Sequence, residues 1–141
     1  MYLTYEEYEN MGGKTLEETA FEQFEFEARA HIDWWTFSRL QNETEYPEAV
    51  KRCMFKLINL LVDKQTAMIV DGQTTDTNNV TKAGITSESN DGVSATYNTL
   101  SASEAVKALE DELEGTIRMY LAGVKNSLGR LLLYRGLYPN E

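Results

Sequence analysis

The sequence contains a single cysteine and a single histidine among its 141 residues. Cys53 alone cannot form an internal disulfide, and its place in an apolar helical pattern indicates a core residue in a reducing compartment. His31 alone cannot supply a histidine-based metal site or a catalytic histidine pair, so we expect a structural or solvent-facing role. The chain also lacks a phosphate-cradling glycine loop, a dinucleotide fingerprint and a calcium loop that ends in glutamate. The sequence therefore predicts no cofactor, no metal ion and no enzymatic activity.

Long apolar runs and basic residues are also scarce. No run approaches the roughly 20 residues that cross a membrane, and the first residues lack the basic and apolar regions of a secretory signal. The net charge is −10, and residues 1–50 carry 12 acids against 3 bases. Beyond Gly115, four bases face only Glu141. This balance disfavours sequence-independent binding of nucleic acid. It suits head-to-tail contact between copies, unless the charges are simply solvated.

Helical patterns dominate what the sequence does contain. A hydroxyl residue followed three positions later by glutamate, the capping-box pattern, occurs at Thr4, Thr15 and Ser101. We predict one mainly α domain over residues 1–141, a small helical bundle with helices at residues 4–11, 16–40, 47–70 and 103–122. Pro47 is expected at the first position of the third helix.

The second predicted helix carries two apolar stripes. The first consists of Leu16, Ala20, Phe24, Ala28, Ile32 and Trp35, and the second of Phe26, Ala30, Trp34 and Phe37. Either the helix is enclosed at the centre of the domain, or one stripe faces a neighbouring subunit. Glu18, Glu22 and Glu25 share a face of the same helix, but one histidine cannot complete the Glu-x-x-His pairs of a metal-binding bundle. We expect those glutamates to form a solvated or interface face.

Between the third and last helices the sequence turns polar. Residues 71–83 predict a mobile loop, and residues 84–98 predict a β-hairpin with strands at 85–89 and 93–97 around the turn Asn90-Asp91-Gly92. A hairpin alone in water is marginally stable, so this one needs the helices or another chain. Residues 123–141 predict an extended or irregular C-terminal arm, whose apolar run at 131–134 packs on its own core or on a neighbour.

Tyrosines gather at both ends of the chain, Tyr2, Tyr5 and Tyr8 at the start and Tyr134 and Tyr138 at the end. They are either interface anchors or ordinary residues at the edge of the core.

Three stretches carry a resemblance to a known family: AVKRCMFKLINLL at residues 49–61, GITSESNDGVSATYNTL at 84–100, and GVKNSLGRLLLYRGLYPNE at 123–141. Together they resemble the head–tail connector (head-completion or adaptor) proteins of long-tailed phages, in the versions common in prophages of Gram-positive hosts. The order of the elements agrees with that family along nearly the whole chain.

The resemblance implies a structural, non-enzymatic virion protein that forms a ring, expected to be a dodecamer, beneath the portal protein of the DNA-filled head. Such a ring extends the DNA channel, retains the packaged genome and docks a downstream neck or tail-completion protein. DNA passes through without specific binding. The protein would assemble in the host cytoplasm and end in the virion neck. The alternative is an acidic helical interaction module or regulator that binds a host or phage protein.

By the same resemblance, two segments are expected to contact the portal and neighbouring copies. The expected contact residues are Ile85, Thr86, Ser87, Glu88, Val93, Ser94, Thr96 and Tyr97 in the hairpin, and Arg130, Tyr134, Arg135 and Tyr138 in the arm.

Overall fold

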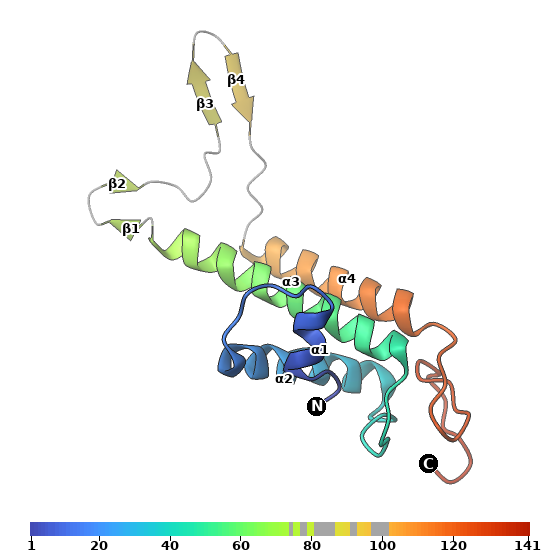
Figure 1. The fold of residues 1–141 in the computed structure, drawn as a ribbon. Helices are drawn as coiled ribbons and strands as arrows, with labels where there is room; N and C mark the ends of the chain where they lie inside the picture. The colour runs from blue at the N-terminus through green and yellow to red at the C-terminus, as the bar shows by residue number, and fades with distance from the viewer. Residues whose placement is uncertain (74, 77–78, 81–86, 91–92, 97–101) are drawn as a thin grey trace.

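The computed structural model describes residues 1–73, 75–76, 79–80, 87–90, 93–96 and 102–141, with side chains in residues 1–66 and 103–141 (Figure 1). Its helices are α1 (Tyr5–Asn10), α2 (Glu18–Thr36), α3 (Glu48–Gln73) and α4 (Ala102–Leu121). Its strands are β1 (Thr75–Asp76), β2 (Asn79–Val80), β3 (Ser87–Asn90) and β4 (Val93–Thr96). The prediction of a mainly helical chain is confirmed.

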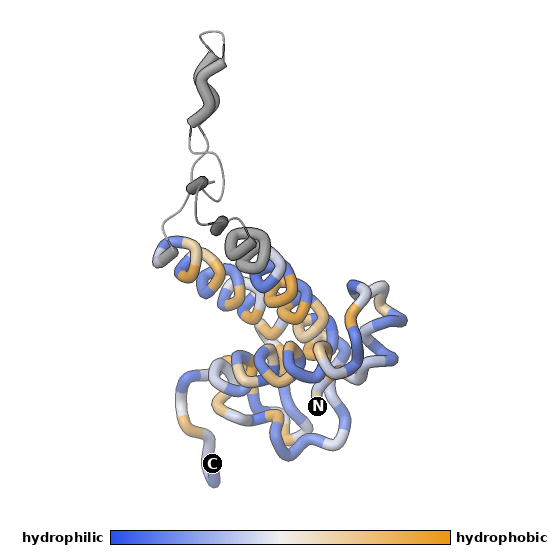
Figure 2. Tube along the Cα trace, turned by 90° about the vertical axis from the view of Figure 1, so that its left-hand side faces the viewer, coloured by the Kyte–Doolittle hydropathy of each residue, from blue (hydrophilic) through white to orange (hydrophobic). Residues whose placement is uncertain are grey.

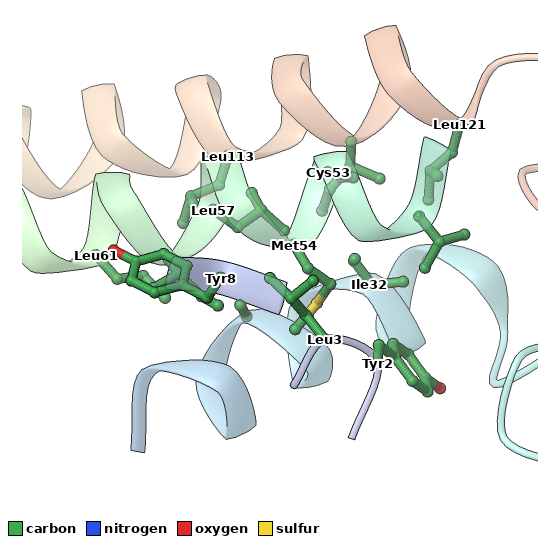
Figure 3. Close-up of a cluster of buried hydrophobic side chains, with 14 of the residues drawn as sticks. Tyr2, Leu3, Tyr8, Ile32, Cys53, Met54, Leu57, Leu61, Leu113 and Leu121 are labelled. Carbon is green, nitrogen blue, oxygen red and sulfur yellow. The ribbon is translucent and has the colours of Figure 1, made fainter. Parts of the chain in front are cut away.

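Helix α3 is the centre of the bundle, with α4 along one side and α2 and α1 along the other (Figure 1). Its core residues recur at helical spacing, and Val50, Cys53, Met54, Leu57 and Ile58 are all fully buried. Side chains of α2, α4 and the N-terminal segment converge on this face, as Figure 3 shows for Ile32, Leu113 and Tyr8. Figure 2 shows hydrophobic and hydrophilic positions alternating around the helices, as expected when each helix buries one side.

Helix α1 forms as the sequence predicts. The Thr4 side chain accepts from the backbone N–H of Glu7, and the Glu7 carboxylate accepts from the backbone N–H of Thr4, so the capping box is complete. The helix ends at Asn10 with Met11 as its C-cap, and Gly12 adopts a positive φ of 80°. Gly13 is needed for a different reason, since a Cβ there would lie 2.3 Å from the Tyr8 ring.

The predicted boundaries of the second helix are wrong at both ends. Helix α2 begins after Glu17, which makes no side-chain cap, so the expected box at Thr15 does not form. The segment before it is held by tertiary bonds, in which the Tyr5 hydroxyl donates to the Leu16 carbonyl and the Lys14 N–H donates to the Tyr8 hydroxyl. At the other end, Phe37 and Ser38 adopt positive φ angles of 54° and 57°. This left-handed turn stops α2 four residues before the predicted end at Leu40.

The last two helices lie close to their predicted positions. Helix α3 begins at Glu48, one residue after Pro47, whose carbonyl accepts from the Lys51 N–H. It continues three residues beyond the predicted end at Val70, so Asp71 and Gly72 are helical and the expected loop starts later. Helix α4 begins one residue earlier and ends one residue earlier than predicted. Ser101, the expected N-cap of α4, lies outside the described residues.

The strands form two antiparallel pairs, β1 with β2 and β3 with β4. In the second pair Ser87 lies opposite Thr96, and Asn90 lies opposite Val93. Both pairs fall within residues 71–98, where the sequence predicts a loop and a hairpin. The turn residues Asp91 and Gly92 and the flanking residues 81–86 and 97–101 lie outside the described residues. A hairpin supported by the helices or by another chain therefore stays a prediction.

The C-terminal arm is irregular, and it packs on the chain's own core. An isolated antiparallel bridge pairs Lys125 with Leu131, and the Leu132 N–H donates to the Val124 carbonyl. Leu132 is fully buried, whereas Leu128 and Leu137 are 69% and 85% exposed. The predicted irregular arm is confirmed.

Candidate interaction surfaces

The arm is fastened by Arg39, whose side chain is only 3% exposed. Its guanidinium donates to four backbone carbonyls of the arm, those of Leu131, Leu132, Tyr134 and Gly136. It also donates to both carboxylate oxygens of Glu141, at 2.7 and 3.1 Å. The planar fork of five N–H donors serves these six acceptors with one N–H shared between two of them, whereas the three donors of a lysine could not satisfy them. One arginine thus holds about ten residues of irregular chain in place.

Sequence reasoning did not single out Arg39. Its partners lie 92 to 102 positions away along the chain, so no local pattern links them. The one available signal is that Arg39 is one of only 3 bases among residues 1–50. A rare base in an acidic, apolar segment is a candidate for a buried ion pair.

The Arg39 guanidinium, helped by the Tyr138 backbone N–H, lowers the pKa of the Glu141 side chain from 4.5 to about 2. A carboxylate whose pKa falls on docking stabilises the docked arm above its ordinary pKa, and this contribution disappears as pH falls through the lowered value. We expect hydrogen exchange of the arm amides to be constant from pH 7 to about 5 and, after correction for intrinsic rates, to lose protection between pH 4.5 and 2. Glu141→Gln should show weaker protection at neutral pH and no change across that window.

Four expected contact residues lie in the arm, and three of them are packed together. The Tyr134 and Tyr138 rings lie 5.0 Å apart, and the Arg130 guanidinium lies 5.7 Å from the Tyr138 ring. The Tyr138 hydroxyl accepts from the Leu131 N–H. Arg135 instead leaves this cluster and stacks over the Trp35 ring at 5.3 Å. The arm residues are therefore divided between two surfaces.

The expected contact residues of the hairpin are only partly described. Ser87 and Glu88 lie in β3, and Val93, Ser94 and Thr96 lie in β4. Ile85, Thr86 and Tyr97 lie outside the described residues. Their contacts with a portal or a neighbouring copy stay a prediction.

The two stripes of α2 have opposite environments. In the first, Ala28 and Ile32 are fully buried and Leu16, Phe24 and Trp35 pack against the core. In the second, Phe26, Trp34 and Phe37 are 65%, 79% and 52% exposed. At about 100° per residue these aromatics lie on the side of α2 opposite Phe21 and Ile32. The interpretation of α2 as an enclosed helix is wrong. We call Phe26, Ala30, Trp34 and Phe37 the aromatic ridge.

A groove of about 770 Å³ runs along the aromatic ridge, and it is bordered by Arg29, Asp33, Gln41 and Arg135. The polar groups on the ridge side are held in place: Asp33 accepts from the Tyr2 hydroxyl and from Gln41, and Arg29 pairs with Glu25 at 3.5 Å. The guanidinium groups of Arg118 and Arg135 both lie over the Trp35 ring, at 5.2 and 5.3 Å from its centre. Exposed aromatics beside arginine are typical of protein interaction anchors.

Several predictions about individual side chains can be compared with the structure. Glu25 is 2% exposed and accepts from the Tyr2 backbone N–H at 2.7 Å, so its expected solvated or interface position is wrong, although Glu18 and Glu22 are exposed. Tyr2 and Tyr8 are buried in the core, and are not surface anchors. Tyr134, at 48% exposed, is on the surface.

Cys53 is buried as predicted, and burial raises the pKa of its thiol to about 12. His31, half-buried on α2, belongs to no cluster of metal-ligating side chains, and the described part of the chain contains no such cluster. Among the same residues, no helix is both long enough and apolar enough to cross a bilayer.

Comparison of the chain with protein-family models, with curated proteins and with solved structures finds no match to any of them.

Proposed function

We propose that this chain is a structural subunit of the head–tail connector of a long-tailed phage, without catalytic activity. Copies of it would form a ring beneath the portal, extend the DNA channel, retain the packaged genome and dock a neck or tail-completion protein. The kind of assembly is inferred from the three stretches at residues 49–61, 84–100 and 123–141 that resemble that family. The virion neck is the proposed location.

The observation that supports assembly is the aromatic ridge. Phe26 and Trp34 on α2 and Phe37 just after it are exposed, and within the monomer only Phe26 and Phe37 have a described ring contact, each with an arginine, so the rings leave apolar surface whose burial would be favourable. A partner that covers the ridge would remove these rings from water and gain that hydrophobic free energy. The ridge lies on a folded bundle, so little ordering is needed when the partner binds.

The charge of the chain is consistent with a channel wall. A net charge of −10 repels a duplex and keeps it from adhering as it passes. The Arg39 guanidinium is hydrogen-bonded to the arm and Arg118 forms an ion pair with Glu114, so both bases already have acidic partners within the subunit. A protein that clamps DNA would instead present its bases in an exposed patch.

The test is light scattering of the purified chain, alone and mixed with its cognate portal protein, with negative-stain images of the mixture. We expect rings stacked on the portal, and we expect deletion of residues 85–97 to abolish them. Deletion of residues 75–80, which removes β1 and β2, is the matched control and should leave ring formation intact. Circular dichroism should show that both deletions keep the helical bundle. Absence of portal association at low salt would favour an acidic interaction module that binds another host or phage protein.

A further inference from the structure

We infer that the aromatic ridge of one copy docks on the outer face of α4 of a second copy, head to tail. This inference rests on the proposed function for the ring, and it assigns the contact between adjacent subunits to two helix faces. Of the described residues expected from the resemblance to make contacts, only Arg135 borders the ridge, and none lies on α4.

The outer face of α4 is exposed and carries mostly small residues. At about 100° per residue, one side of the helix carries an exposed stripe, namely Ala105, Ala108, Glu112, Gly115, Met119 and Ala122. Met119 is 69% exposed, and a Cβ added at Gly115 would meet nothing within 4 Å. Leu113, Ile117 and Leu121, on the other side of α4, are buried against the bundle. The four small residues of the stripe leave room for aromatic rings, and Met119 adds apolar surface for them to contact.

The charges of the two faces are complementary as well. Arg135 borders the groove with its guanidinium over Trp35, and among residues 1–66 and 103–141 no carboxylate forms an ion pair with it. The stripe on α4 includes the exposed Glu112, with Asp111 beside it. Glu112 on the stripe and Asp111 beside it would thus supply the carboxylate that Arg135 lacks among the described residues of its own subunit.

Helices α2 and α4 pack on α3 from its two sides (Figure 1), and they also touch each other where Arg118 stacks over Trp35. The ridge and the stripe are different faces of the subunit, so a contact between them is heterologous, and copies related by it form a closed ring or an open chain. A contact of ridge with ridge would instead stop at a dimer. The placement of the faces therefore suits a ring.

Disulfide trapping tests the pairing even when the contact is weak. The Trp34→Cys and Gly115→Cys variants are mixed and oxidised with copper phenanthroline, while the buried Cys53 provides no background. In an equimolar mixture random pairing gives twice as much mixed dimer as either homodimer, and we expect the 34–115 dimer to exceed that ratio. It should also exceed the dimer from a control mixture in which Glu110→Cys, exposed on α4 but outside the stripe, replaces Gly115→Cys. Predominance of the 34–34 homodimer, or equal yields in the two mixtures, would overturn the inference.

A second pair of variants tests the same contact in the assembled complex. Gly115→Arg places a long cation on the stripe opposite Arg135, and the fold should tolerate it because the site is open and arginine is a better helix former than glycine. Glu110→Gln changes the net charge by the same amount outside the stripe. We expect ring formation on the portal to be lost with Gly115→Arg and kept with Glu110→Gln. If both variants form rings on the portal, the proposed function stands and the α2–α4 contact is wrong.

Discussion

Replacing Arg39 with alanine is expected to detach the C-terminal arm and to lower the free energy of unfolding by about 3 kcal/mol. The buried guanidinium donates to four backbone carbonyls of the arm, and of these only the Leu131 carbonyl also accepts from a described backbone N–H, that of Tyr134. Once the donors are gone, the carbonyls must be hydrated, and the arm has to leave the surface for water to reach them. Leu132 then loses its buried position as well.

Urea denaturation measures the stability change, and limited proteolysis after Lys125 or Arg130 measures release of the arm. Arg39→Lys should recover little, because an ammonium offers three donors and no planar fork. Arg52→Ala is the matched control, since Arg52 pairs with Glu48 on the exposed surface of α3 and its loss should cost no more than about 0.5 kcal/mol. An Arg39→Ala chain as stable and as protease-resistant as the Arg52→Ala chain would contradict the role assigned to Arg39.

Sequence reasoning succeeded where the determining contacts are local. The Thr4 capping box was predictable because both of its hydrogen bonds join residues three positions apart. The same pattern at Thr15 fails because Tyr5 and Tyr8 bind the neighbouring backbone through hydroxyl groups 6 to 11 positions away. Tertiary bonds of that kind leave no periodic signal in the sequence, so the start of α2 was misplaced.

The end of α2 and the role of Arg39 were unpredictable for the same reason. Phe37 and Ser38 have positive φ angles, although neither is the glycine or asparagine that usually marks a left-handed helix end. This turn places the next residue, Arg39, where its guanidinium can donate to the C-terminal arm, more than 90 positions later in the chain. The hydrogen bonds of Arg39 therefore stabilise the turn. The conformation of Phe37 and Ser38 thus depends on contacts that form only in the folded chain.

The aromatic ridge could be predicted from the sequence as an apolar stripe of α2, but its exposure could not. Helical periodicity revealed both stripes of α2, because side-chain spacing alone places residues on a face. It could not decide which stripe α3 covers, since both contain large aromatic residues. In the structure the buried side of α2 also contains Glu25, whose carboxylate accepts from the Tyr2 N–H. Nothing in the sequence distinguishes this buried glutamate from the exposed glutamates of the same helix.

Because one face of α2 is buried and the other is exposed, replacing phenylalanine with alanine should lower the free energy of unfolding strongly on the first face and hardly at all on the second. Phe21→Ala is expected to lower the free energy of unfolding by about 3–5 kcal/mol, because Phe21 is fully buried and its removal leaves a cavity. Its ring lies 5.4 Å from Tyr5 and 5.2 Å from Tyr8, so α1 loses its contact with α2 as well. Thermal and urea unfolding of the isolated chain measure this loss.

Phe26→Ala, in the same helix, should change the stability of the isolated chain by no more than about 0.5 kcal/mol. Phe26 is 65% exposed, and its one described ring contact is with Arg29 at 5.5 Å. Alanine also forms helix better than phenylalanine, which offsets the lost contact. If the aromatic ridge is the subunit contact, Phe26→Ala should nevertheless weaken ring formation on the portal, measured by negative-stain counting of rings. A Phe26→Ala chain that is destabilised as much as Phe21→Ala would place Phe26 in the core of the subunit and remove the ridge as a docking surface.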